Sequence, residues 1–200
     1  YGMLSEEKFF DKAKKFALYH TVKDTYFTFE ELIAKTKDSQ TDKDGNHIIL
    51  YAANKDAQHS YIQDATAKGY EVLILDSPIV SHLMQKLETS EEKIKFTRVD
   101  ADHIDNLIKK EDTVISKLSE DEKEKLKPMI EDNVPKETYT VQLEAMDSAA
   151  SPFMITVPEF MRRMKEMSAT GGGMMGMGKL PEMYNLVVNT NHPLVGEILN

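Results

Sequence analysis

Methionine is the residue type whose number and clustering point to chemistry in this chain. The sequence contains 12 methionines among 200 residues, and nine of them lie between Met146 and Met183. Unbranched thioether side chains adapt to surfaces of many shapes, which suits a protein that binds varied partners. The same soft sulfur atoms also suit Cu(I), so copper binding is an alternative that a Cu(I) titration would test.

Several of these methionines share one face of a helix predicted from Pro158 to about Met167. Proline is tolerated in the first turn of a helix, and the i, i+4, i+7 spacing that follows brings the apolar side chains together. The apolar residues are Phe160, Met161, Met164 and Met167. We expect the opposite face to carry the charged residues, which are Arg162, Arg163, Lys165 and Glu166.

The sequence is compatible with two environments for the apolar face of this helix. Phe160 and Met164 either pack on the strands predicted within residues 138–157, stabilising the fold by about 1.5–3 kcal/mol per buried side chain, or remain exposed. The next methionines follow the run Gly171-Gly172-Gly173, and such a glycine-rich loop is too loose to hold side chains in a fixed core. We therefore expect pliable, exposed apolar surface at Met174, Met175 and Met177.

Patterns typical of catalytic or metal sites are not found in the sequence. The six histidines include no pair at i, i+3 or i, i+4, so a metal site would require distant positions to converge. The glycine run lacks the preceding strand and the following lysine-serine pair of a phosphate-binding loop. The serines lack the neighbours of a nucleophile elbow, and there is no cysteine for disulfides or thiol chemistry. We predict no catalytic, cofactor-binding or metal-binding residue in this chain.

The composition also limits the classes of partner. The formal net charge is −9, and the only arginines are Arg98, Arg162 and Arg163, which argues against a general nucleic-acid-binding surface. No apolar run approaches the roughly 20 residues that a membrane-spanning helix needs, so no membrane partner is expected. The segment from Tyr1 to Ser5 lacks the features of a signal peptide, and both ends look cut, so we expect a fragment of a longer protein.

Residues 1 to about 110 are predicted to form a helical lead-in followed by a small three-layer α/β unit. The lead-in begins with a helix capped by Ser5, whose apolar face includes Phe10 and Phe16. Short apolar runs then predict buried strands, and the segments between them have helical spacing, an order typical of a parallel sheet. The predicted strands are 48–51, 72–75 and 94–99, and the predicted helices are 56–67 and 79–87.

Residues 111–200 are predicted to form a smaller α+β domain, with the boundary placed near Glu111. A capping box of Ser119 and Glu122 starts one helix, which Pro128 should bend by removing a backbone donor. Apolar and polar residues then alternate with the period of a strand that has one buried face. The strand segments are 138–145, 153–157 and 186–188, and the methionine-bearing helix precedes the last of them.

Several stretches of this sequence, spread over nearly the whole chain, occur in the same order as segments of a known protein family. Ala67 to Val80 contains Gly69-Tyr70-Glu71-Val72-Leu73, and Asn189 to Pro193 has the pattern Asn-x-x-His-Pro. The other stretches are 1–2, 13–19, 28–32, 126–130, 152–167 and 184–194. In this order they resemble the 90-kDa heat-shock chaperone family in its bacterial HtpG form, from the end of the middle domain into the C-terminal domain.

The resemblance implies a division of roles between this chain and a longer parent. The family is an ATP-driven, homodimeric, cytoplasmic chaperone whose ATP and Mg²⁺ bind in an N-terminal domain outside this chain. The dimerising helices would follow Asn200, so tight self-association belongs to the parent. The implied partners are client proteins that are unfolded or partly folded. The implied client-contact residues are Phe160, Met161, Met164, Met167, Met174, Met175 and Met177.

A small α/β enzyme or ligand-binding domain is the alternative that the residues leave open. Open parallel sheets bind ligands beyond the carboxyl ends of their strands, which places such a site near Tyr51 and Asp76. Asp76 would then be the acid group. A small molecule that raises the melting temperature in a saturable manner would favour this alternative, whereas the missing phosphate loop argues against it.

Overall fold

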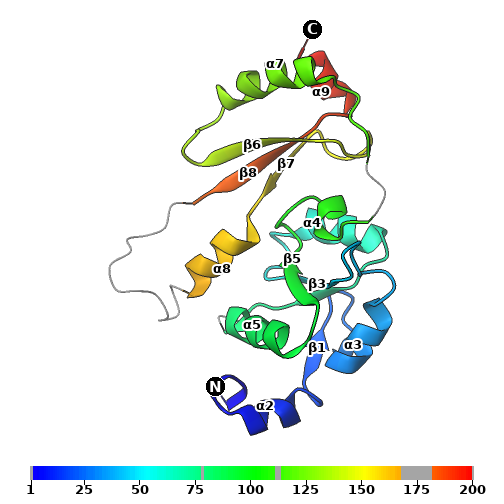
Figure 1. Cartoon of the computed structure of the whole chain (residues 1–200), viewed down its shortest axis with the longest axis vertical. Helices are drawn as coiled ribbons and strands as arrows, with labels where there is room; N and C mark the ends of the chain where they lie inside the picture. The colour runs from blue at the N-terminus through cyan, green and yellow to red at the C-terminus, as the bar shows by residue number, and fades with distance from the viewer. Residues whose placement is uncertain (1, 78, 111–113, 168–181, 200) are drawn as a thin grey trace.

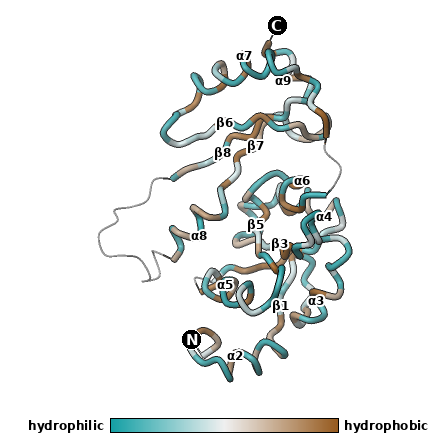
Figure 2. The backbone as a smooth tube through the Cα atoms, in the orientation of Figure 1, coloured by the Kyte–Doolittle hydropathy of each residue, from teal (hydrophilic) through white to brown (hydrophobic). Residues whose placement is uncertain are grey.

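The structure, a computed structural model, describes residues 2–77, 79–110, 114–167 and 182–199 (Figure 1). Within them, two three-stranded sheets and one two-stranded ribbon combine with helices into a mixed α/β fold. No helix in these ranges is both long and apolar enough to cross a bilayer. Hydrophobic colour is concentrated along the strands inside the molecule (Figure 2). The predicted boundary near Glu111 lies outside the described residues.

The first sheet contains three parallel strands in the order β4-β3-β5. These are β3 (His47–Ala52), β4 (Val72–Ile74) and β5 (Ile94–Arg98). The central strand β3 is buried at every residue. A strand covered on both faces needs apolar side chains in succession, which is the pattern of Ile48-Ile49-Leu50-Tyr51. The parallel pairing predicted from alternating strands and helices is confirmed.

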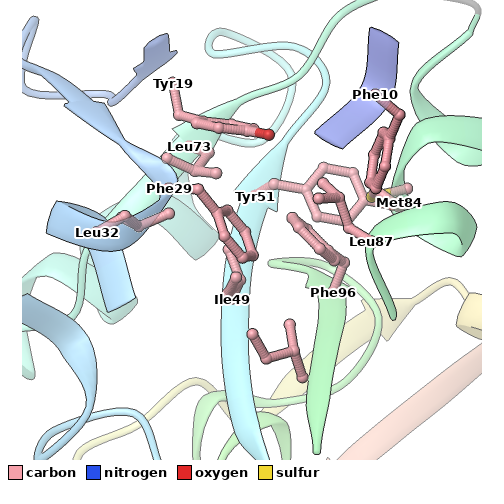
Figure 3. Packing of buried hydrophobic residues seen from close by; sticks show 11 residues of the cluster. Phe10, Tyr19, Phe29, Leu32, Ile49, Tyr51, Leu73, Met84, Leu87 and Phe96 are labelled. Carbon is pink, nitrogen blue, oxygen red and sulfur yellow. The ribbon is translucent and has the colours of Figure 1, made fainter. Parts of the chain in front are cut away.

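Helices cover both faces of the first sheet, because the side chains of a strand point alternately to its two sides. The helices are α3 (Phe29–Thr36), α4 (His59–Ala67), α5 (Val80–Ser90) and α6 (Ile104–Leu107). Ile49 and Tyr51 of β3 share one apolar cluster with residues of α3 and α5 (Figure 3). Ile48 and Leu50 belong to a second cluster with residues of α4 and α6.

The segment before the first sheet differs from its prediction. Instead of one helix capped by Ser5, two short helices follow each other, and the second begins without a side-chain cap. That second helix ends at Ala13 because the chain then extends into an antiparallel ribbon. Phe10 is therefore buried whereas Phe16 is 80% exposed, and the predicted common face is wrong. The elements are α1 (Gly2–Ser5), α2 (Glu7–Ala13), β1 (Leu18–His20) and β2 (Tyr26–Thr28).

The second sheet combines one parallel and one antiparallel pair. Its elements are α7 (Glu120–Glu131), β6 (Tyr139–Glu144), β7 (Phe153–Thr156), β8 (Tyr184–Asn189) and α9 (Pro193–Glu197). The strand order is β6-β8-β7, with β8 parallel to β6 and antiparallel to β7. The last strand in the sequence therefore separates the two strands that precede it. Leu126 and Ile130 of α7 pack on one face of this sheet together with Val195 of α9.

A buried asparagine fixes the corner after β8. The side-chain Nδ2 of Asn191 donates to the carbonyl oxygens of Ile115 and Met146, each at 3.0 Å. Its Oδ1 accepts the backbone N–H of Lys117 at 2.6 Å. One amide side chain thus joins the segment before α7, the end of the β6 strand segment and the start of α9.

The capping box predicted for α7 is present. The hydroxyl of Ser119 accepts the N–H of Glu122 at 3.3 Å, and the carboxylate of Glu122 accepts the N–H of Ser119 at 2.7 Å. These bonds satisfy donors that have no partner within the helix. The helix begins there and continues past Pro128 to Glu131.

This capping box yields a pH-dependent prediction. The hydrogen bonds from the backbone and hydroxyl of Ser119 lower the pKa of Glu122 below its ordinary value of 4.5. A carboxylate with a lowered pKa stabilises the helix start above the ordinary value, and this contribution is lost as the pH falls through the lowered pKa. We expect Ser119→Ala to return the pKa of Glu122 toward its ordinary value in an NMR titration. An unchanged pKa would mean that the hydroxyl of Ser119 does not contribute to the shift, which the backbone N–H of residue 119 would then cause alone.

Candidate functional site

Helix α8, Glu159–Met167, is the described element that carries the predicted contact residues. It follows β7 of the second sheet and lies beside α5 of the first (Figure 1). Just before it, the N–H of Val157 donates to the carbonyl oxygen of Asp100 at 2.8 Å, which ties the start of the helix to the first sheet. The helix therefore links the two parts of the chain.

Most of the charged side chains of α8 point inward, whereas Lys165 is exposed. Arg162 is only 7% exposed, and its guanidinium lies 5.4 Å from the centre of the Tyr51 ring. It donates hydrogen bonds to the hydroxyl of Tyr51, to Glu159 and, at 2.6 Å, to Glu166. Burial opposes the charged form, but the negative charge of Glu159 and the other partners outweigh it and raise the pKa of Arg162. The guanidinium is therefore both buried and charged.

Arg163 extends this inward contact to α5 and β5. Its guanidinium donates two hydrogen bonds to Glu88, at 2.8 and 3.1 Å, the bidentate geometry that fits arginine to a carboxylate. It also donates to the carbonyl oxygen of Phe96 at 2.6 Å and to Glu159 at 2.7 Å. Burial opposes the charge, yet the hydrogen bonds to Glu88 and Glu159 raise the pKa of Arg163 above its ordinary value. A single side chain thus joins three elements.

Two glutamates of α8 complete the contact with the first sheet. Glu159 accepts the N–H of Arg98 and the hydroxyl of Tyr51, each at 3.1 Å. Glu166 accepts the hydroxyl of Ser81, and its carboxylate lies 3.9 Å from the guanidinium of Arg98. Burial raises the pKa of Glu166, but the hydrogen bonds from Ser81 and Arg162 outweigh it and lower the pKa. The α8 ionic cluster, as we name it, consists of Tyr51, Glu88, Arg98, Glu159, Arg162, Arg163 and Glu166.

The apolar face of α8 lies on the side opposite to the ionic cluster, and Phe160 is its exposed member. Phe160 is 71% exposed, so the alternative in which Phe160 packs on the second sheet is wrong. The physical reason is that the ionic cluster already fixes the opposite face of the helix. On the neighbouring strand β7, Phe153 and Ile155 are also exposed. The other members of the apolar face, Met161, Met164 and Met167, are partly exposed. The remaining predicted contact residues, Met174, Met175 and Met177, lie outside the described residues.

The spacing of the apolar residues predicts the apolar face of α8, but the ionic cluster was not predicted from the sequence. One signal was present: Glu159 precedes Arg162 and Arg163 by three and four residues, the spacing of ion pairs on one side of a helix. That spacing predicts the pairs, but it does not predict that they are buried. The partners Glu88 and Tyr51 lie far away in the sequence and carry no local signal of this contact.

The alternative enzyme site near Tyr51 and Asp76 does not have an accessible phenol. Tyr51 is buried, and its hydroxyl group is held by Arg162 and Glu159. Burial, followed by the negative charge of Glu159, raises the pKa of the Tyr51 phenol, which therefore remains protonated. Asp76 is exposed after the end of β4. Among the residues that the structure describes, no group of three or more histidine or acidic side chains is arranged to hold a metal ion.

Comparison with known proteins identifies the family. The family model described as Hsp90 protein matches residues 1–200. Proteins named chaperone protein HtpG from Bacteroides thetaiotaomicron and Bacteroides fragilis are 45% and 46% identical to this chain over 203 and 202 residues. The HtpG protein of Porphyromonas gingivalis is 41% identical over 203 residues. Each match covers 100% of this chain, and the alternative of a small α/β enzyme finds no support among these relatives. The chain, which spans about 30% of the length of these relatives, therefore belongs to the Hsp90 protein family.

Proposed function

We propose that this chain is the scaffold and client-contact part of an Hsp90-type molecular chaperone. Its clients are unfolded or partly folded polypeptides, which expose apolar side chains. The observation that supports the proposal is the orientation of α8: Arg162 and Arg163 are held against the first sheet, while Phe160 is exposed and Met161, Met164 and Met167 are partly exposed. Apolar surface that a protein leaves uncovered by its own fold is typical of a binding site. The family resemblance adds Met174, Met175 and Met177 to the same contact surface.

The division of roles within a longer parent protein is part of this proposal. Residues 1–110 are the helical lead-in and small α/β part of a middle domain, and residues 111–200 are a C-terminal domain without its dimerising helices. Binding of ATP and Mg²⁺, ATP hydrolysis and tight homodimerisation belong to other parts of the parent, which acts in the cytoplasm. The 30% share of its relatives that this chain covers supports such a division.

Replacing Phe160 by serine tests the proposal. We expect the affinity for a permanently unfolded protein to fall about tenfold, because an aromatic anchor removed from an interface costs on the order of 1–2 kcal/mol. The free energy of unfolding should change by no more than about 0.5 kcal/mol, because the side chain is exposed. Fluorescence anisotropy of a labelled, reduced and carboxymethylated protein measures the first quantity, and urea unfolding measures the second.

Phe16→Ser is the matched control for this experiment. Phe16 has the same side chain and is even more exposed, but it lies in the lead-in between α2 and β1. We expect this change to leave the affinity for the unfolded protein unaltered. Equal losses in both variants would mean that any exposed aromatic residue binds the client nonspecifically. Unaltered affinity in Phe160→Ser would contradict the assignment of α8 as the contact surface.

A further inference from the structure

All three arginines of the chain take part in the α8 ionic cluster. Arginine differs from lysine in its planar guanidinium, which binds a carboxylate at two points and thereby fixes orientation as well as charge. Each remaining cationic side chain of the sequence, apart from histidine, is a lysine. The guanidinium of Arg98 binds Asp100 and only approaches Glu166, whereas Arg162 and Arg163 join α8 to the first sheet by direct hydrogen bonds, so these two residues can fix the orientation of α8.

The orientation that they fix is the reverse of that of an ordinary surface helix. An amphipathic helix on a protein surface normally buries its apolar side and exposes its charged side. In α8 it is Arg162 that is buried and Phe160 that is exposed. Burial of apolar area alone would favour turning the helix over, so the polar contacts must hold it in place. The buried Nε of Arg162 has no hydrogen-bond partner among the described residues, which reduces the stability of this contact.

The first sheet provides a prearranged acceptor for Arg163. Glu88, in the last turn of α5, accepts the N–H of Phe96 at 2.7 Å through the same carboxylate that receives the guanidinium. This bond fixes the carboxylate relative to β5 independently of α8. The carbonyl oxygen of Phe96 then supplies a further acceptor for Arg163 at 2.6 Å. The guanidinium therefore meets acceptors whose positions are set by the α/β part of the chain.

We infer that Arg162 and Arg163 are positioning residues that hold α8 with its apolar face outward and so set the affinity for client without touching it. This inference rests on the proposed function, because its readout is client binding. When the ionic cluster opens, α8 is free to turn its apolar face onto the exposed Phe153 and Ile155 of β7. The client then competes with the protein's own apolar surface, and its apparent affinity falls.

Substitutions at the contact between Arg163 and Glu88 test this inference in the whole 200-residue chain. Arg163→Met keeps an unbranched apolar stem but removes the guanidinium with its charge and two-point geometry, and we expect about tenfold weaker binding of the reduced, carboxymethylated protein. Arg163→Lys should recover only part of the affinity, because lysine restores charge without the planar fork. Glu88→Gln retains an acceptor for the N–H of Phe96. It is the alternative test variant if Arg163→Met disturbs folding. Lys165→Met, on the same helix but outside the ionic cluster, should bind normally.

The orientation of α8 is measurable directly, because the chain has no cysteine of its own. Cysteines introduced at Lys165 on α8 and at Glu92 after α5, both exposed, accept spin labels for a distance measurement by electron paramagnetic resonance. We expect one narrow distance distribution in the doubly labelled chain that is otherwise unaltered. In the chain that also carries Arg163→Met, we expect a broader or shifted distribution. If distance and client affinity are both unaltered in Arg163→Met and Glu88→Gln, the inference is overturned.

A double substitution separates positioning from a general structural role. In the Arg163→Met background, Phe160→Ser should reduce client affinity less than about twofold, because Phe160 is no longer presented. If the fold-losses in client affinity of the two single variants multiply in the double variant, the two residues act independently. The positioning role would then be rejected. Failure of Phe160→Ser in the unaltered chain refutes the proposed function itself. A loss there, combined with normal binding by Arg163→Met and Glu88→Gln, refutes only the positioning role.

Discussion

Replacing Leu50 by alanine is expected to lower the free energy of unfolding of the first sheet by about 3 kcal/mol. Leu50 lies in the central strand β3 and is 0% exposed. Its side chain belongs to the apolar cluster that includes Ile62 and Ala65 of α4. Truncation removes those apolar contacts and leaves a cavity, because the parallel neighbours of β3 on both sides prevent the backbone from moving in to fill it.

Urea unfolding followed by circular dichroism measures this effect, with separate transitions fitted if the two sheets unfold at different urea concentrations. Leu18→Ala is the control, because Leu18 is 65% exposed on β1 and its loss should change stability by no more than about 0.5 kcal/mol. A loss at Leu50 as small as that at Leu18 would contradict the position of β3 at the centre of the core.

Asn191→Ala should destabilise the second sheet by about 2–3 kcal/mol, the second largest effect that we expect. The substitution leaves the N–H of Lys117 and the carbonyl oxygens of Ile115 and Met146 without the side-chain partner that they have now. The side chain of Asn191 is almost fully buried, so water replaces it poorly. The loss should appear in the urea transition of the second sheet and leave that of the first sheet unaltered.

Asn185→Ala provides the comparison for this change. Asn185 lies on β8, the strand that precedes Asn191, and is partly exposed. We expect its substitution to cost no more than about 0.5 kcal/mol, as at other surface positions. Similar losses at the two asparagines would show that the hydrogen bonds of Asn191 do not account for its effect.

The elements with strong local patterns were predictable from the sequence. Four apolar residues in succession identified β3, because a strand buried on both faces has no polar side to show. The capping box of Ser119 and Glu122 identified the start of α7, since its two hydrogen bonds involve residues only three positions apart. The helix expected to include Phe16 was wrong, because pairing of β1 with β2 takes the chain away from helical geometry before that residue.

The candidate site was predictable only in part. The spacing of Phe160 and Met164 correctly groups them on one face, since spacing fixes which side chains lie together on a helix. Spacing does not determine which face finds a partner. That choice depends on Glu88 and Tyr51, which approach α8 only in the folded chain. Charge patterns on a helix therefore need a tertiary structure before they can be assigned to solvent or to the interior.

The position of β8 between β6 and β7 has a consequence for how a nascent chain emerging from the ribosome acquires its shape. The first sheet can close early, because β3 pairs with strands that are synthesised soon after it. In the second sheet, neither β6 nor β7 has a neighbouring strand among the described residues until the polypeptide has been translated through Asn189. Until then, both strands and the helix that follows β7 belong to an incomplete sheet, whose exposed apolar residues favour aggregation.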